Sequence, residues 1–197
     1  NVILFDTDRE NLYPLSFTRP ISSFRVGIST IKEKWEFYYN DVSVKTDDYL
    51  SEKFSIKIEK DNIWINSSIL PNKDIVTEIN SLRKGELLKK DEVVIAIHNH
   101  IFSISGLDEI ESHSKFNKIN DLWDIFSLNG EEIQKDFSKI TKGRKSQDLG
   151  KFDIKIGDFP LFIEKGAKIE YSFINCTKGP VYIGKDAEIM EGSFIRG

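Results

Sequence analysis

Two arginines in the loop behind the first apolar run could bind phosphate groups. Arg9 and Arg19 follow residues 2–5, a run that consists of Val, Ile, Leu and Phe. An arginine can hold a phosphate through two parallel hydrogen bonds, a geometry that a lysine does not offer. Two such side chains suit chemistry in which negative charge spreads over phosphoryl oxygens. The residues alone therefore indicate phosphate binding close to the start of the chain.

Two histidines could hold a metal ion, but the sequence favours a structural role for them. His98 and His100 flank Asn99, and alternate residues of a strand lie on one face. Zinc sites use at least three protein ligands, and no cysteine or acidic partner is evident near this pair. We therefore expect no zinc site here, and we expect His113 in its polar run to be solvated.

Strand and helix patterns alternate through most of the chain. Residues 2–5, 63–65 and 93–97 are continuous apolar runs, as expected of strands that are covered on both faces of a sheet. Apolar residues recur at helical spacing in three further segments, the first of which carries Ile28, Ile31, Trp35 and Tyr38. Asn72 and Asp121 are expected to cap the other two helices. The acidic and basic residues of the stretch 84–92 are expected to be solvated. This pattern predicts a Rossmann-like α/β domain over residues 1–145.

A repeat of six residues begins beyond a polar linker, the stretch of residues 144–150. Ile183, Ile189 and Ile195 are spaced by six, and Ile163 begins a similar hexad with Ala167 at its fifth place. In a triangular parallel β-helix the aliphatic residue points into the prism, and only a small residue fits near the corner. The alternative is a β-hairpin region with chance spacing. We favour a left-handed parallel β-helix, with residues 146–197 forming the linker and its first coils.

Composition and charge argue against several classes of protein. The chain is 39% hydrophobic and 30% charged, and no apolar run approaches the roughly 20 residues of a membrane-spanning helix. The formal net charge is −4, with basic and acidic residues interleaved, so we expect neither a nucleic acid nor a membrane as partner. The single Cys176 and the lack of a leader-like segment predict a cytoplasmic location.

The loop of residues 9–20 resembles the signature loop of the sugar nucleotidyltransferases. Nearly the whole chain is similar to the Bacteroidetes type of this family, which resembles the uridyltransferase half of the bifunctional N-acetylglucosamine-1-phosphate uridyltransferase/acetyltransferase. Further similar stretches are residues 25–28, 32–35, 70–72, 123–130 and 183–193. Within the loop, the positions that match the family signature are Arg9, Leu12, Pro14, Leu15, Ser16 and Pro20.

The resemblance implies an enzyme that transfers a nucleotidyl group from a nucleoside triphosphate to a sugar-1-phosphate and releases pyrophosphate. Arg9 and Arg19 would be catalytic, stabilising charge on the phosphoryl oxygens. Arg25 could replace the family's lysine in binding phosphate, and Asp6 and Asn66 are the other expected binding residues. The family also implies Mg²⁺ as cofactor and a homotrimer assembled through the β-helix, which can carry a second, acyltransferase activity.

The family pattern is incomplete around the first loop. The usual glycines are absent between Phe5 and Arg9, and Asn66 stands where a metal-binding Asp is usual. Asp6 and Asp8 are therefore the expected Mg²⁺ ligands, with solvated turn residues as the alternative. Two further functions stay open: a non-catalytic nucleotide- or sugar-binding scaffold descended from such an enzyme, and the substrate-binding part of a β-helix acyltransferase.

Overall fold

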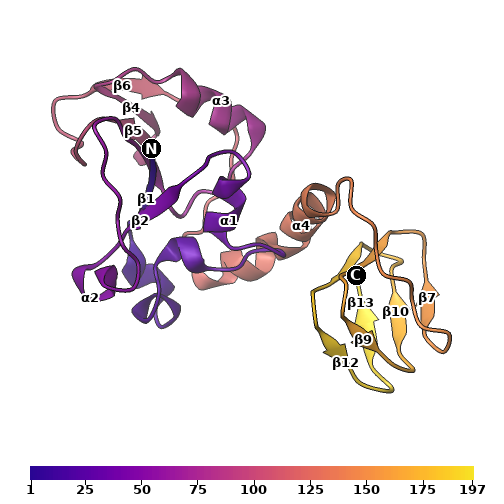
Figure 1. Cartoon of the computed structure of the whole chain (residues 1–197). Coiled ribbons are helices and arrows are strands. Elements are labelled where there is room, and N and C mark those ends of the chain that lie inside the picture. Colours follow the sequence, from indigo (N-terminus) through magenta and orange to yellow (C-terminus); the bar gives the residue numbers. More distant parts are fainter. The chain divides into compact units, whose positions relative to one another are not determined.

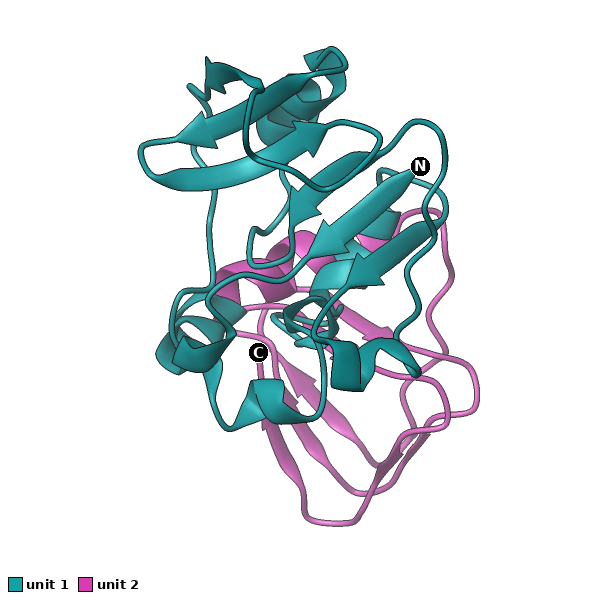
Figure 2. Cartoon of the chain, turned by 90° about the vertical axis from the view of Figure 1, so that its left-hand side faces the viewer, with its two compact units in different colours: residues 1–129 teal, residues 130–197 magenta.

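The computed structural model describes residues 1–197, which fold into two compact units. The first unit comprises Asn1–Asn129 and the second Gly130–Gly197 (Figure 2). The division falls inside the long helix α4 (Leu122–Ile140). Strands that pair in parallel occur in both units, and helices accompany the sheet of the first, so the chain is a mixed α/β protein. The predicted domain boundary at residue 145 stays a prediction.

A six-stranded sheet forms the centre of the first unit (Figure 1). Its strand order is β2-β1-β3-β5-β4-β6. The strands β2, β1 and β3 run parallel, whereas β5 is antiparallel to its neighbours β3 and β4, and β6 is parallel to β4. The strands are β1 (Val2–Phe5), β2 (Val42–Lys45), β3 (Ile63–Asn66), β4 (Glu86–Lys90), β5 (Val93–His98) and β6 (Asp108–Glu111).

The first strand is buried on both faces of this sheet, as its continuous apolar run predicts. Val2 and Leu4 pack into a large core cluster that also contains Trp35. Ile3 and Phe5 point to the opposite face and pack into a second cluster. Because side chains alternate along a strand, four apolar residues in a row need apolar cover on both sides. The three predicted strands are confirmed at β1, β3 and β5.

Helices and short turns connect the strands. Three 3-10 turns, Arg9–Leu12, Leu15–Phe17 and Ile21–Ser23, shape the loop behind β1. The other helices of the first unit are α1 (Ile31–Glu36), α2 (Asp48–Ser51) and α3 (Lys73–Ser81). Asn72 caps α3 as predicted, because its side chain accepts hydrogen bonds from two backbone N–H groups. None of the helices is both long enough and apolar enough to cross a membrane.

The sequence did not reveal β4. The acidic and basic residues of 84–92 are exposed or partly exposed, as expected, but the same stretch forms a strand in which Leu87 and Leu88 are buried at 3% and 1% exposure. Leu88 packs into the large core cluster on one face of the sheet and Leu87 into the cluster on the other face, cover that their charged neighbours in sequence do not reveal. Helix α1 begins at Ile31 rather than near Ile28, because Thr30 and Glu33 form a capping box that sets its first turn.

The second unit is a stack of short parallel strands. Each strand pairs in parallel with the third strand after it, so β7, β10 and β13 share one ladder, β8 and β11 a second, and β9 and β12 a third. Ile163, Ala167, Ile174 and Ile183 pack together in its core. The strands are β7 (Ile154–Ile156), β8 (Leu161–Ile163), β9 (Lys168–Ile169), β10 (Phe173–Asn175), β11 (Val181–Ile183), β12 (Glu188–Ile189) and β13 (Phe194–Arg196).

We predict that Gly157 is required for this stack whereas Gly184 is not. Gly157 has a φ of 90°, and an added Cβ would lie 2.4 Å from the carbonyl carbon of Cys176. Gly157→Ala should therefore destabilise the protein by about 2–4 kcal/mol through backbone strain and overpacking. The matched control, Gly184→Ala, adds a Cβ with no atom within 4 Å and should change stability by less than about 0.5 kcal/mol. Urea unfolding followed by circular dichroism measures both, and equal losses would contradict the prediction.

Candidate functional site

The carboxyl ends of three parallel strands meet at one edge of the sheet. Phe5 pairs with Lys45 on one side and with Asn66 on the other, so the residues that follow these strands are neighbours. After β1 the chain continues to β2 on one side of the sheet, and after β3 it continues to β4 and β5 on the other side. The connections that follow the neighbouring strands β1 and β3 therefore run in opposite directions. In open α/β sheets, ligands bind outside the carboxyl ends of strands at such a switch point. A ligand-binding site is therefore expected beyond the carboxyl ends of β1, β2 and β3.

Asp6 ties the three strand ends to the loop behind β1. Its side chain is only 2% exposed. One carboxylate oxygen accepts hydrogen bonds from Ile21 N at 3.2 Å and from Ser67 Oγ at 2.5 Å. The other accepts from Thr46 Oγ1 at 2.7 Å and from Arg9 Nη1 at 2.8 Å. The carboxylate thus makes four hydrogen bonds within the protein, which leaves it little capacity to bind a ligand.

The guanidinium of Arg9 is also engaged within the protein. Its side chain is 7% exposed, and Nη2 donates to the carbonyl of Ser16 and, at 3.0 Å, to Tyr49 Oη. Nη1 reaches the carbonyl of Arg19 at 3.4 Å in addition to Asp6, and Nε lies 2.8 Å from Asp47 Oδ2. Arg9 therefore holds the loop in place. Nη1 and Nη2 are used within the protein, and Nε, although it makes no hydrogen bond, is buried, so the guanidinium is not open to a phosphate as the sequence led us to expect.

Charge balance keeps this buried arginine ionised. Burial on its own would lower the pKa of the Arg9 guanidinium. The hydrogen bond and the charge of Asp6, followed by Tyr49 and Asp47, more than offset burial and raise that pKa above its ordinary value. A buried ion pair with its hydrogen bonds satisfied is stable, whereas either partner alone would be a buried unpaired charge. Arg9 and Asp6 therefore act as one structural unit.

The structure brings Arg19 and Arg25 together at the surface of the same loop. Both are exposed, and both line a pocket of about 140 Å³ with Leu15, Phe24 and Ile125. No hydrogen bond or ion pair engages the guanidinium of Arg19. The backbone carbonyl of the same residue accepts the hydrogen bond from Arg9 Nη1. These two arginines, rather than Arg9 and Arg19, are the pair that can meet a ligand.

Arg25 is only loosely held by its neighbours. Its Nη1 donates to the carbonyl of Ile28 and lies 3.9 Å from a carboxylate oxygen of Glu33. The side chains of both Arg25 and Glu33 are half or more exposed, so this ion pair is weak and screened by salt. A phosphate could therefore compete for the guanidinium at small cost.

The predicted Mg²⁺ ligands do not form a metal site. Asn66 is 3% exposed, its Nδ2 donates to Val94 O at 3.0 Å, and its Oδ1 accepts from the backbone and hydroxyl of Ser68. Asp8 is exposed and lies 3.8 Å from Lys118 Nζ. Three or more histidine, cysteine or carboxylate side chains do not gather anywhere in the chain in a way that could hold a metal ion. With Asp6 engaged as well, these residues do not fit Mg²⁺, which needs accessible oxygen ligands.

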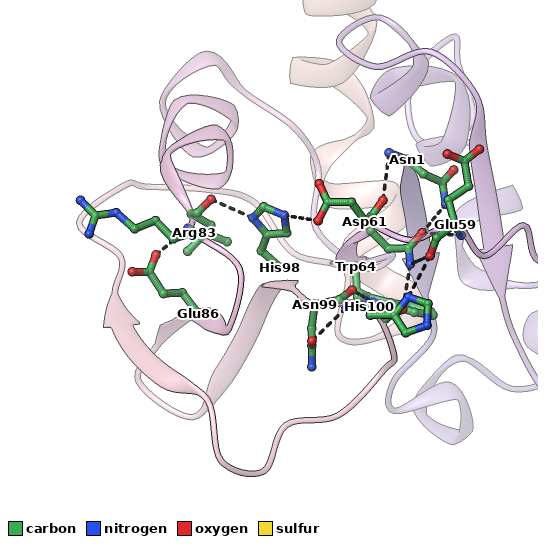
Figure 3. A network of polar contacts seen from close by, with 11 residues as sticks. Asn1, Glu59, Asp61, Trp64, Arg83, Glu86, His98, Asn99 and His100 are labelled. Carbon is green, nitrogen blue, oxygen red and sulfur yellow. Dashed lines mark hydrogen bonds and ion pairs between the residues drawn. The ribbon is translucent and has the colours of Figure 1, made fainter.

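His98, the last residue of β5, and His100, which follows it, lie near the start of β3, away from its carboxyl end. Figure 3 shows their polar contacts. His98 pairs with Ile63 at the start of β3. Its Nδ1 lies 2.8 Å from Leu82 O and its Nε2 lies 2.9 Å from Asp61 Oδ1, and this hydrogen bond lowers the pKa of Asp61. His100 is bound to the carbonyl of Glu59 at 3.0 Å. Each ring has its own protein partner, as expected of structural histidines.

Sequence reasoning missed the residues that complete the Asp6 network. Thr46 and Ser67 follow β2 and β3, and Tyr49 belongs to α2. The end of β3 was recognised, but β2 was not, because its alternating pattern of Val42, Ser43, Val44 and Lys45 spans only four residues. A signal that could have found Ser67 is its position directly after a predicted strand.

One family model matches most of the chain. It is described as sugar nucleotidyl transferase and matches residues 2–145. This range includes the sheet, the loop behind β1 and the whole of α4, and it ends before β7. No curated protein matches the chain significantly.

We predict that Asp6 and Arg9 stabilise the protein jointly. Asp6→Ala or Arg9→Ala should each cost about 3–5 kcal/mol of unfolding free energy, because each leaves the partner as a buried unpaired charge. The double variant should cost less than the sum of the two losses. Urea unfolding followed by tryptophan fluorescence is suitable, since Trp35 and Trp64 are buried in this unit. Glu10→Ala, an exposed change in the same loop, is the control at less than about 0.5 kcal/mol. Strictly additive losses would refute the coupling.

Proposed function

The chain belongs to the sugar nucleotidyl transferase family, and from that premise we propose that it joins a nucleotidyl group from a nucleoside triphosphate to a sugar-1-phosphate. In this reaction an oxygen of the sugar phosphate forms a bond to the α-phosphorus. The bond from that phosphorus to the β,γ-diphosphate breaks, and pyrophosphate leaves with the electron pair. Negative charge on the phosphoryl oxygens must be stabilised throughout, so placed cations supply much of the catalysis.

The observation that carries the proposal is the placement of Arg19 and Arg25. Both are exposed, both line one pocket, and the carbonyl of Arg19 is held 3.4 Å from Arg9 Nη1 beside the end of β1. We assign the phosphate contacts to Arg19 and Arg25. Arg9 and Asp6 are positioning residues, because they fix the loop that presents the other two. Since the neighbouring side chains do not fit Mg²⁺, no step of the proposal runs through a metal held by the protein.

We further propose that the second unit is a left-handed parallel β-helix built on hexapeptide repeats, through which the protein forms a homotrimer. Pairing of every third strand and the aliphatic core of Ile163, Ile174 and Ile183 support a three-sided coil. Ala167 in that core agrees with the need for a small residue in the hexad. Size-exclusion chromatography with light scattering tests the trimer, and a monomer at micromolar concentration would argue against it.

A second candidate is a binding domain without catalytic activity. It is favoured by the engagement of Asp6, Arg9 and Asn66 inside the protein, which removes three residues from direct chemistry. Such a domain would still bind a nucleotide through Arg19 and Arg25. The two candidates therefore differ in turnover and agree on binding, which one assay can separate.

We predict that Arg19→Ala/Arg25→Ala weakens nucleoside triphosphate binding about 10–100-fold, because two charge-assisted contacts are lost. Fluorescence anisotropy with a labelled triphosphate measures the affinity. Arg83→Ala, an exposed arginine at the opposite edge of the sheet, is the matched control and should leave the affinity unchanged. Unchanged affinity in the double variant would remove the assigned phosphate site.

Turnover is tested by pyrophosphate release. The protein is incubated with a panel of sugar-1-phosphates and nucleoside triphosphates, with Mg²⁺ supplied in the buffer. The enzyme should release pyrophosphate only when both substrates are present, and the double variant should lose that activity. Saturable triphosphate binding without release for any pair would favour the binding domain instead.

A further inference from the structure

A second cavity lies beside the edge strand β2, away from the arginine pocket. Its volume is about 460 Å³, within the usual range for sites that bind small molecules. It shares no lining residue with the pocket of Arg19 and Arg25. The lining residues come from the loop behind β1, from α1, from β2 and from the segment after α2: Ser23, Lys32, Asp41, Val42, Ser43, Val44, Lys53, Phe54, Ser55 and Lys57.

The cavity exists because β2 has a sheet neighbour on one side only. Lys45 O accepts from Asp6 N on the β1 side, so alternation turns the backbone groups of Val42 and Val44 towards the free edge. The segment 53–57 runs along that edge without forming a ladder. It is held through Ser43, whose Oγ lies 3.2 Å from Lys57 N and 3.4 Å from Lys57 O. The segment 53–57 occupies the side of β2 where a further strand would pair. The cavity lies between this segment and β2 and is open to a small molecule.

Positive charge prevails in the lining. Three lysines face one carboxylate, that of Asp41. Lys32 lies 2.6 Å from Glu36. Lys57 lies 3.0 Å from Glu59 and 3.9 Å from Asp41 Oδ2, and all of these pairs are exposed and therefore weak.

The third lysine is the most available. Lys53 Nζ lies 5.5 Å from the centre of the Phe54 ring and has no carboxylate partner. A dianionic phosphate placed among the three ammonium groups would meet one without a carboxylate partner, that of Lys53, and two that are held only in exposed ion pairs. Lys53 therefore favours an anion in this cavity.

The remaining lining selects the kind of anion. Ser23, Ser43 and Ser55 supply hydroxyl groups that can donate to and accept from the hydroxyls of a polyol. Phe54 adds an aromatic surface, which suits the C–H face of a sugar ring. We propose that this cavity is an accessory site for a sugar phosphomonoester, separate from the triphosphate site. The inference goes beyond the proposed function and does not depend on it.

Isothermal titration calorimetry of the full chain tests the site with D-glucose-6-phosphate as probe. Saturable binding is expected, and Lys53→Ala/Lys57→Ala should weaken it at least about tenfold. Raising the ionic strength from about 0.05 to about 0.5 M should weaken it as well, since exposed charges are screened. Ser55→Phe should also abolish binding, because it fills the cavity without changing its charge. The control Lys73→Ala removes an exposed lysine of α3 and should have no effect.

The outcomes separate this site from the proposed function. Arg19→Ala/Arg25→Ala should lose triphosphate binding and keep binding of the sugar phosphate, and the lysine variant should show the reverse. No heat with the native protein, or equal affinity in native and Lys53→Ala/Lys57→Ala proteins, would overturn the proposal. Equal affinity for inorganic phosphate and the sugar phosphate would overturn the role given to the serines and Phe54.

Discussion

The buried ion pair of Asp6 and Arg9 is the interaction on which the first unit depends. Asp6 follows β1, and its carboxylate joins residues after β2 and β3 to the backbone of the loop at Ile21. Arg9 reaches the carbonyls of the same loop. Removing one member of a buried ion pair leaves the other as an unpaired buried charge, so these contacts favour the observed conformation of the loop.

This arrangement replaces a glycine-rich turn with side-chain hydrogen bonds. No glycine stands between Phe5 and Arg9, and the sharp change of direction is made at Asp8, which adopts a φ of 53°. Backbone N–H groups that a glycine-rich loop would offer to phosphate are not presented in the same way. The exposed arginines of the loop are Arg19 and Arg25, which line one pocket, and the proposed phosphate contacts are therefore assigned to them.

The six-stranded sheet of the first unit and the short ladders of the second differ in what lies against their strands. In the first unit, β2 is an edge strand whose free side is covered by a segment held through a serine, and the space left between them is lined by lysines. In the second unit, the strands form short parallel ladders, and the rings of Phe173 and Phe194 stack with their centroids 5.0 Å apart on the paired strands β10 and β13. Exposed backbone edges invite pairing, so covering or stacking them is a general requirement.

The sequence by itself determined the elements whose signals are local. The burial of four apolar residues in β1 and the Asn72 cap of α3 follow from short-range chemistry. Only the tertiary structure decided which arginine is buried: Arg9 and Arg19 look equivalent along the chain, but Asp6, Thr46 and Tyr49 converge on Arg9 from different elements. It also decided that Leu87 and Leu88 belong to a strand. Burial and charge pairing depend on neighbours distant in sequence, and local spacing carries no record of them.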